Sequence, residues 1–455
     1  MPRPRLFHSS IVVAALGLLA ACSHRGSADG APASSLDTAP ASPASAEPPP
    51  IVPEVVAPGA VKPVHPGSGA IASARAAPPA LPVDPGADLI EPARELFRVA
   101  ACGEAGDVPA RFDSHVVDAH CKSLKALYAR YRTRWLDVAE PFIAGLRPQG
   151  LPGKVVYPFG GGDLVTALAV FPDAEEITTM SLEPPGDVRR IDAILPIRLK
   201  GAFTVIDHNI MKLLGMSYSN TINLGRGDRA WLPGEIVLHL AALVVHGYEP
   251  TSLRYFKFNP DGTLHYLSAD EIEAEGNLEH PEPEGGRAPF ANVELHFKKA
   301  GSTGSDKVLR QIAHDLANRE VGLDPGLRKY LESRGQVAVM TKAASHLLWA
   351  DDFSTIRDYL LEHAEWMISD STGVPPRFAS AAGFVQDTYG IFDGPAPFGP
   401  IEPLDGHAFR RLFAENPKKH LPFKFGYGDV HHRSHLVVMR KADASAKTSA
   451  DAASK

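Results

Sequence analysis

Short apolar runs alternate with helical patterns along the second half of the chain, from about Gly153 onward. The run KVVYPF, residues 154–159, is typical of a buried strand, and residues 163–174, DLVTALAVFPDA, predict a helix with Asp163 at its N-cap. Residues 175–184, EEITTMSLEP, predict the next strand. Strands separated by helices indicate an α/β fold with a Rossmann-like, mostly parallel sheet and helices on both faces.

The pattern after this unit predicts more helices and two antiparallel hairpins. The helices are recognised by apolar residues at three- and four-residue steps, and the hairpins by turn residues between apolar runs. We expect helices over residues 234–247, 305–320 and 353–367, a hairpin turn at residues 261–262 and a C-terminal antiparallel hairpin within residues 423–441.

The N-terminus carries an export signal. Two arginines precede the apolar stretch IVVAALGLLAA, residues 11–21, which is shorter than the roughly 20 residues of a membrane-spanning helix. The sequence LAAC, residues 19–22, resembles the lipobox of bacterial lipoproteins. That resemblance implies cleavage before Cys22, a lipid anchor on this cysteine, and a location in the cell envelope. Ser23 favours the outer membrane, and an ordinary secretory peptide is the alternative.

Composition divides the chain into five segments. After a signal peptide of residues 1–21, residues 22–88 are rich in Ala, Pro and Ser and contain no aromatic residue. Such a segment buries too little apolar surface to offset its ordering entropy, so we expect a disordered tether. A helical extension over residues 89–150, a Rossmann-like domain over residues 151–441 and a disordered tail of residues 442–455 follow.

Two further cysteines lie in the predicted helical extension. Cys102 and Cys121 are an even pair once Cys22 carries lipid, and an even pair in an exported domain commonly forms a disulfide. We expect this bond to join the first helix to the second and to stabilise the fold by about 3 kcal/mol. Two buried thiols are the alternative.

The charge balance argues against one class of partner. The chain has 46 Lys and Arg and 53 Asp and Glu, a formal net charge of −7, and the basic residues are scattered along it. Nucleic-acid binding requires a concentrated basic face, so we expect no nucleic-acid partner. The membrane, reached through the lipid anchor, is the expected partner, and any further envelope partner or small ligand stays open.

Three consecutive glycines follow the first predicted strand, in YPFGGGD, residues 157–163. A strand, a glycine turn, a helix and a strand that ends on an acid, here Glu183, resemble a dinucleotide-binding unit and the class I methyltransferases, which bind S-adenosylmethionine. The third glycine of that pattern is Val165 here, and Asp163 would compete with a phosphate for the helix N-terminus. These cofactors are also cytoplasmic, so we expect a tight turn without a cofactor.

Polar residues also follow other predicted strands. Lys342 and Ser345 follow the strand QVAVMT, and Asp370 lies in SDSTG. Because function collects at the carboxyl ends of strands in open α/β sheets, these residues could meet in one cleft. A lysine beside carboxylates is a catalytic base or a structural ion pair, and we favour the ion pair. The candidate cleft comprises Tyr157, Gly160, Gly161, Gly162, Asp163, Glu183, Lys342, Ser345 and Asp370.

A histidine-rich stretch near the C-terminus could hold a metal. GDVHHRSH contains His431, His432 and His435 beside Asp429. On a strand, adjacent side chains point to opposite faces, so only the first and third of these histidines share a face. The stretch also lies at a predicted turn. We therefore expect an exposed polar hairpin tip and no metal site.

Several of these motifs together resemble a family of uncharacterised exported bacterial lipoproteins. The shared features are a Y-P-F-x-G-x-D turn, a following L-E-P, and a K-A-A-S…F-S-x-I-R segment, within residues 150–440. The resemblance implies an export route and a fold but no reaction. We expect a membrane-anchored lipoprotein with a binding role. The alternative is an exported enzyme, methyltransferase-like or a hydrolase, that uses the cleft at the carboxyl ends of the strands.

Overall fold

The computed structural model describes residues 86–104, 106–216, 232–276, 290–393, 405–426 and 434–442. All of them belong to one compact unit, Asp84–Lys455. The predicted signal peptide, Cys22 and almost all of the predicted tether and tail lie outside the described residues. Among the helices of the described ranges, none combines the length and the apolar character that crossing a membrane requires.

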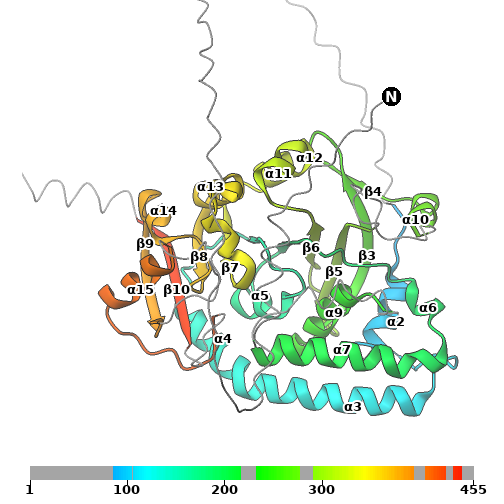
Figure 1. The fold of residues 1–455 in the computed structure, drawn as a ribbon. Helices are drawn as coiled ribbons and strands as arrows, with labels where there is room; N and C mark the ends of the chain where they lie inside the picture. Colours follow the sequence, from blue (N-terminus) through cyan, green and yellow to red (C-terminus); the bar gives the residue numbers. More distant parts are fainter. Residues whose placement is uncertain are drawn as a thin grey trace, which may run out of the picture. The chain divides into compact units, whose positions relative to one another are not determined.

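The strands form one ten-stranded sheet (Figure 1). Its order is β4 (Leu264–Tyr266), β3 (Tyr248–Phe258), β5 (Asn292–Lys299), β6 (Lys307–Ala313), β2 (Glu176–Ser181), β1 (Lys154–Tyr157), β7 (Val337–Thr341), β8 (Ala364–Ser369), β10 (His435–Lys441) and β9 (Phe384–Gly390).

Five neighbouring strands at the centre of this sheet, from β6 to β8, run parallel. Antiparallel strands extend the sheet on both sides, β5, β3 and β4 beyond β6, and β10 and β9 beyond β8. The α/β fold and the C-terminal antiparallel pair are confirmed. The sheet is mixed rather than mostly parallel, because the insertion between β2 and β6 adds three antiparallel strands.

Helices cover both faces of the sheet, as predicted. Side chains alternate along each strand, so Val155 and Tyr157 of β1 enter one core while Val156 enters the other. The first core is covered by α2 (Ile90–Val99), α3 (Ser114–Tyr131), α4 (Asp137–Ala144), α5 (Leu164–Val170), α6 (Arg190–Ala193), α7 (Pro196–Met216), α9 (Gly234–His246) and α10 (Ala269–Gly276). The second is covered by α11 (Asn318–Leu323), α12 (Pro325–Glu332), α13 (Ser354–His363), α14 (Pro376–Ala381) and α15 (Asp405–Glu415).

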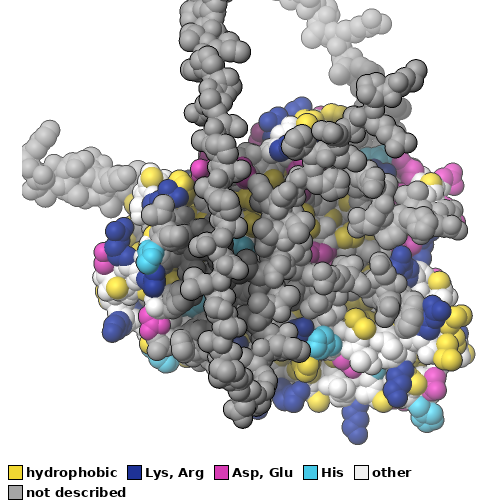
Figure 2. Space-filling view, viewed as in Figure 1, with side chains coloured by type: hydrophobic (Ala, Val, Ile, Leu, Met, Phe, Trp, Pro, Cys, Tyr) yellow, Lys and Arg dark blue, Asp and Glu magenta, His cyan; other side chains and the backbone are white. Residues whose placement is uncertain are grey.

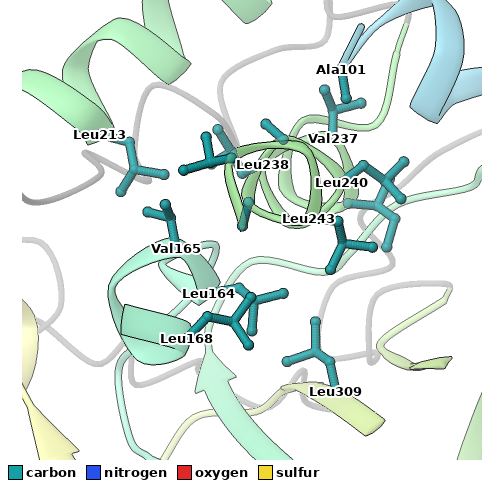
Figure 3. Packing of buried hydrophobic residues seen from close by; sticks show 14 of the residues in the cluster. Ala101, Leu164, Val165, Leu168, Leu213, Val237, Leu238, Leu240, Leu243 and Leu309 are labelled. Carbon is teal, nitrogen blue, oxygen red and sulfur yellow. The ribbon is translucent and has the colours of Figure 1, made fainter. Parts of the chain in front are cut away.

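Helix α9 is buried on almost every side. Its residues 235–246 are buried with the exception of Val244, which is typical of a helix that is apolar all round. Figure 3 shows Leu243 on the side of this helix that faces Leu164 of α5 and Leu309 of β6, and Leu238 on the side that faces Leu213 of α7. The helix ends where predicted, at Gly247, whose φ of 69° lies in the left-handed region that glycine tolerates best. Helix α9 therefore links the glycine turn before α5 to the sheet.

Two predicted helices are partly strands. Residues 305–320 contain β6 and the start of α11, because alternate residues of 307–313 enter opposite cores between β2 and β5. Residues 353–367 contain α13, which ends at His363, and the beginning of β8. Each of these strands forms backbone hydrogen bonds with a neighbouring strand on both sides. This pairing outweighs the local helical periodicity from which the two helices are predicted.

The C-terminal antiparallel pair has a different first strand from the one expected. Strand β10 pairs with β9, residues 384–390, and not with the FKFG segment at residues 423–426. That segment is irregular, and the rings of Phe423 and Phe425 are buried in the first core. Its apolar residues therefore reflect burial of a loop rather than a strand.

The helical extension and the α/β domain share one hydrophobic core. Leu96 of α2 and Leu124 of α3 belong to the same buried cluster as Leu164 of α5. The predicted disulfide is confirmed, and it joins Cys102, just after α2, to Cys121 of α3 with the two Cα atoms 5.2 Å apart. The extension is therefore an integral layer of the domain.

Replacing both Cys102 and Cys121 by serine is expected to lower the free energy of unfolding by about 3 kcal/mol, because the bond closes a loop with a sequence separation of 19 residues. Urea denaturation monitored by circular dichroism measures the change. Reduced wild-type protein should match the double variant. Two reactive thiols in denatured protein that has never met a reductant would contradict the pairing.

Candidate functional site

The glycine turn between β1 and α5 is closely packed against the protein's own atoms. A Cβ atom at Gly160 would lie 2.6 Å from the ring of Tyr157, and one at Gly162 would lie 2.7 Å from a methyl carbon of Leu238 in α9. Gly161 has a φ of 46°, in the left-handed region. Internal contacts and backbone conformation therefore account for all three glycines.

Asp163 is the N-cap of α5 and the centre of a buried polar cluster. Its Oδ1 accepts hydrogen bonds from the hydroxyl of Thr166 at 2.7 Å and from the backbone N–H of the same residue at 3.4 Å. Its Oδ2 accepts from the hydroxyl of Tyr157 at 3.0 Å and forms an ion pair with Nζ of Lys342 at 2.6 Å. The side chains of Asp163 and Lys342 are 3 % and 1 % exposed, so this charge pair is desolvated and fully enclosed.

Lys342 reaches Asp163 from the carboxyl end of β7. Its Nζ also donates to the hydroxyl of Thr166 at 3.1 Å, and the ring centroid of Phe425 lies 5.6 Å from the same nitrogen. Ser345 lies in the first turn of the following 3₁₀ helix, Ala343–Trp349, and accepts from the backbone N–H of Lys342 at 2.9 Å, so its hydroxyl serves as a cap. This geometry is that of a structural ion pair closed over by aromatic rings.

Tyr157 stays a hydrogen-bond donor within this cluster. Burial raises the pKa of its hydroxyl well above the usual range, and the nearby carboxylates of Asp163 and Asp370 raise it further. The protonated hydroxyl donates to Asp163. The cluster is thereby satisfied without a ligand.

Asp370 lies after β8, on the same edge of the sheet. Its carboxylate accepts from the backbone N–H of Thr372 at 2.8 Å, whereas its Oδ2 has no hydrogen-bond partner among the described residues. The next residue, Ser371, shares a hydrogen bond of 2.9 Å with Nε2 of His435. His435 is fully buried in β10, which contradicts the expected exposed hairpin tip, because its ring packs against Phe392. Residues 429, 431 and 432 of the predicted histidine group lie outside the described residues.

Glu183 is directed to a second polar group, beside helix α9. Its backbone carbonyl accepts from the side-chain amide of Gln311 at 3.2 Å, and its carboxylate lies close enough to Glu235 to raise the pKa of that residue. Of the nine predicted cleft residues, Tyr157, Asp163 and Lys342 therefore form one buried polar cluster, whereas Glu183 turns toward Glu235. The three glycines and Ser345 serve packing and capping beside that cluster.

Glu235 is the residue that sequence reasoning missed. It lies in the first turn of α9 and is 2 % exposed, and neither carboxylate oxygen has a hydrogen-bond partner within the described residues. A Cβ atom at Gly162 would lie 2.9 Å from its Oε2. Burial, followed by the negative charge of Glu183, raises the pKa of Glu235 well above its usual range. Its signal in the sequence is an acid at the start of an otherwise apolar helix, GEIVLHLAALVVH.

Helix α9 also carries two buried neutral histidines. Nε2 of His239 lies 2.8 Å from Oε1 of Gln311, and Nε2 of His246 lies 2.9 Å from the carbonyl oxygen of Val165. Because both partners accept, each Nε2 carries the proton. Burial lowers the pKa of both imidazoles to about 4. A carboxylate of Glu140 lies 3.6 Å from Nδ1 of His246 but is 44 % exposed, so solvent screens its attraction.

Replacing Glu235 by methionine is expected to raise the free energy of unfolding by about 1–3 kcal/mol at pH 8, because it removes a buried, unpaired carboxyl group. The folded pKa of Glu235 is raised, so its stability contribution is present at low pH and is lost as the pH rises above the ordinary glutamate value. The gain should therefore grow from pH 4 to pH 8. Glu332→Met, at an exposed position of α12, is the control, and an equal gain there would refute this account.

Metal-binding residue types come together once within the described part of the chain. The group is Cys102, His120 and Cys121, whose sulfur atoms are already bonded to each other. A surface depression of about 450 Å³ lies at the amino end of β1, opposite the glycine turn, beside Arg147 and Asp173. Neither feature adds a reactive group to the cluster around Asp163.

Comparison with protein-family models finds no match for this chain, and comparison with curated proteins finds none either. The family expected from the Y-P-F-x-G-x-D turn therefore stays a prediction.

Proposed function

We propose that this protein is an envelope lipoprotein, anchored through Cys22, whose α/β domain binds a partner rather than catalysing a reaction. The observation that supports the binding role is the buried ion pair of Asp163 and Lys342 at the glycine turn. These side chains occupy the position where a Rossmann-like domain would receive an anionic cofactor.

An anionic ligand at this turn would meet three obstacles. Asp163 already accepts a backbone N–H of the first turn of α5, that of Thr166, which a phosphate would use. Lys342 and Asp163 neutralise each other, so this lysine offers no net positive charge to an anion at the turn. Leu238 and Glu235 pack directly against Gly162, so the backbone there is covered. The protein's own side chains therefore cover the glycine turn.

A second candidate, an exported enzyme, is favoured by one observation. Glu235 and Glu183 are neighbouring carboxyl groups in different environments, one enclosed with a raised pKa and the other half-buried at the end of β2. A carboxyl group with a raised pKa serves as a general acid beside a second carboxyl group in several hydrolases. In that case Glu235 would donate a proton and Glu183 would accept one.

The anchor is tested by replacing Cys22 with serine. We expect the wild type to take up labelled palmitate and to sediment with membranes, and the variant to be released into the soluble fraction, because acyl chains supply the membrane affinity. Ser23→Ala, which keeps the cysteine, should remain membrane-bound. The lipid anchor would be ruled out if the Cys22→Ser variant still sediments with membranes and the wild type takes up no labelled palmitate.

Ligand binding is tested by a thermal-shift screen, which measures the melting temperature of the full chain with Cys22→Ser in the presence of each candidate ligand. Candidate ligands are S-adenosylmethionine, nucleotides and cell-wall fragments, and a ligand at 100 times its dissociation constant stabilises by about 2.7 kcal/mol. We expect no shift with S-adenosylmethionine or nucleotides. A shift that Glu235→Gln abolishes and Glu332→Gln preserves would place a ligand at Glu235, and turnover of that ligand by the wild type but not by Glu235→Gln would replace the binding proposal with the enzyme.

A further inference from the structure

Helices α3 and α7 lie side by side and form an outer layer of the domain (Figure 1). The ring of His120 in α3 stacks on Phe203 of α7 with the centroids 4.0 Å apart, and its Nδ1 lies 2.9 Å from a carboxylate oxygen of Asp207. These contacts hold the two helices together, so their solvent-facing sides form one surface, the α3/α7 face.

Large hydrophobic side chains are exposed on α7 to an unusual degree. Eight large hydrophobic residues are exposed in the described part of the chain, and four of them lie on α7 or immediately before it. They are Leu195, Ile197, Val205 and Met211, with exposed fractions of 53, 88, 40 and 51 %. A single exposed hydrophobic residue needs no explanation, whereas several on one helix mark an interaction surface.

Basic side chains surround these hydrophobic residues. Figure 2 shows Lys and Arg side chains along the lower edge of the molecule, over α3, next to hydrophobic side chains over α7. The exposed basic residues of α3 and α7 are Lys122, Lys125, Arg130, Arg198 and Lys200, and the exposed or partly exposed acids of the same two helices are Asp118 and Asp207. The face is therefore positive, although the chain as a whole carries a formal charge of −7.

This combination matches the surface of an anionic lipid bilayer. Basic residues attract anionic headgroups, and exposed apolar side chains on the same helical surface enter the boundary between headgroups and acyl chains. We propose that the α3/α7 face docks on the surface of a membrane that contains anionic phospholipid.

This inference rests on the proposed anchor, which would supply the proximity. Between Cys22 and the first described residue lie about 65 residues, and a coil of that length spans roughly 45 Å. The domain would stay close enough to the membrane for a weak surface attraction to act at a high effective concentration. Docking would then hold the domain flat, with the opposite face of the sheet turned away from the bilayer.

The experiment uses the full chain with Cys22→Ser, so that the anchor plays no part. Flotation with vesicles of phosphatidylcholine and phosphatidylglycerol in a 7:3 ratio should recover the protein, and flotation with pure phosphatidylcholine should not. Raising the salt from 0.05 M to 0.5 M should release it, because salt screens exposed charges. Lys122→Glu with Lys125→Glu should weaken vesicle binding at least tenfold.

The matched control reverses two charges on the other side of the sheet. Arg328→Glu with Lys329→Glu, in α12, makes the same change in net charge and should leave vesicle binding unchanged. Ile197→Ser with Met211→Ser should weaken binding at 0.05 M salt while leaving the salt dependence of the remaining binding as in the wild type. Equal loss in both charge-reversed variants, or no recovery with anionic vesicles, would overturn the docking proposal. Palmitate labelling would still report on the anchor by itself.

Discussion

Replacing Lys342 by methionine is expected to lower the free energy of unfolding by about 3–5 kcal/mol, because it leaves the carboxylate of Asp163 charged and enclosed without its partner. The remaining donors, the hydroxyl of Tyr157 and the N–H and hydroxyl of Thr166, satisfy the oxygen atoms but not the charge. Chemical denaturation at pH 7 measures the loss.

Two variants show that burial causes this loss. Lys419→Met removes an ion pair of the same 2.6 Å length whose partners are 36 % and 21 % exposed, and it should cost at most about 1 kcal/mol. Adding Asp163→Asn to Lys342→Met removes the stranded charge and should recover a large part of the stability. If Lys342→Met costs no more than Lys419→Met, the pair at the glycine turn is not a structural ion pair, and the binding proposal loses its main support.

Acidification from pH 7 to pH 4 is expected to cost about 3 kcal/mol for each of His239 and His246. Both have a folded pKa of about 4, below the ordinary value of 6.5. Their stabilising effect is therefore present above about pH 6.5 and is lost as the pH falls toward 4, where the unfolded chain binds protons that the folded chain excludes. Two such losses are a large share of the 5–15 kcal/mol that is typical of a folded domain.

The variant His239→Gln tests this acid sensitivity. It removes one titrating group while keeping a polar side chain near Gln311, so the fall in stability between pH 7 and pH 4 should shrink by about half. His115→Gln, at an exposed position of α3, should leave the fall unchanged. NMR titration of the His239 ring gives an independent check, and an imidazole pKa near 6.5 in the folded protein would disprove the assignment.

Local sequence signals predicted much of the fold correctly. The N-cap at Asp163, the helix end at Gly247 and the disulfide of Cys102 with Cys121 all depend on neighbouring residues or on a simple count, and all three are present. Strand β6 and the first part of β8, up to Met367, lie in segments for which a helix is predicted, because their residues satisfy a helical spacing as well as an alternating one. Pairing with neighbours distant in sequence decided between the two patterns.

At the candidate site, too, some features follow from the sequence and others only from the tertiary structure. The sequence by itself identified the glycine turn, the capping aspartate and the polar residues that end the strands. Only the tertiary structure decided that Lys342 neutralises Asp163 and that Glu235 packs against Gly162. Periodicity and capping are properties of consecutive residues. The charge state of a buried group depends on which distant side chains exclude water from it, and the folded arrangement of the whole domain sets those contacts.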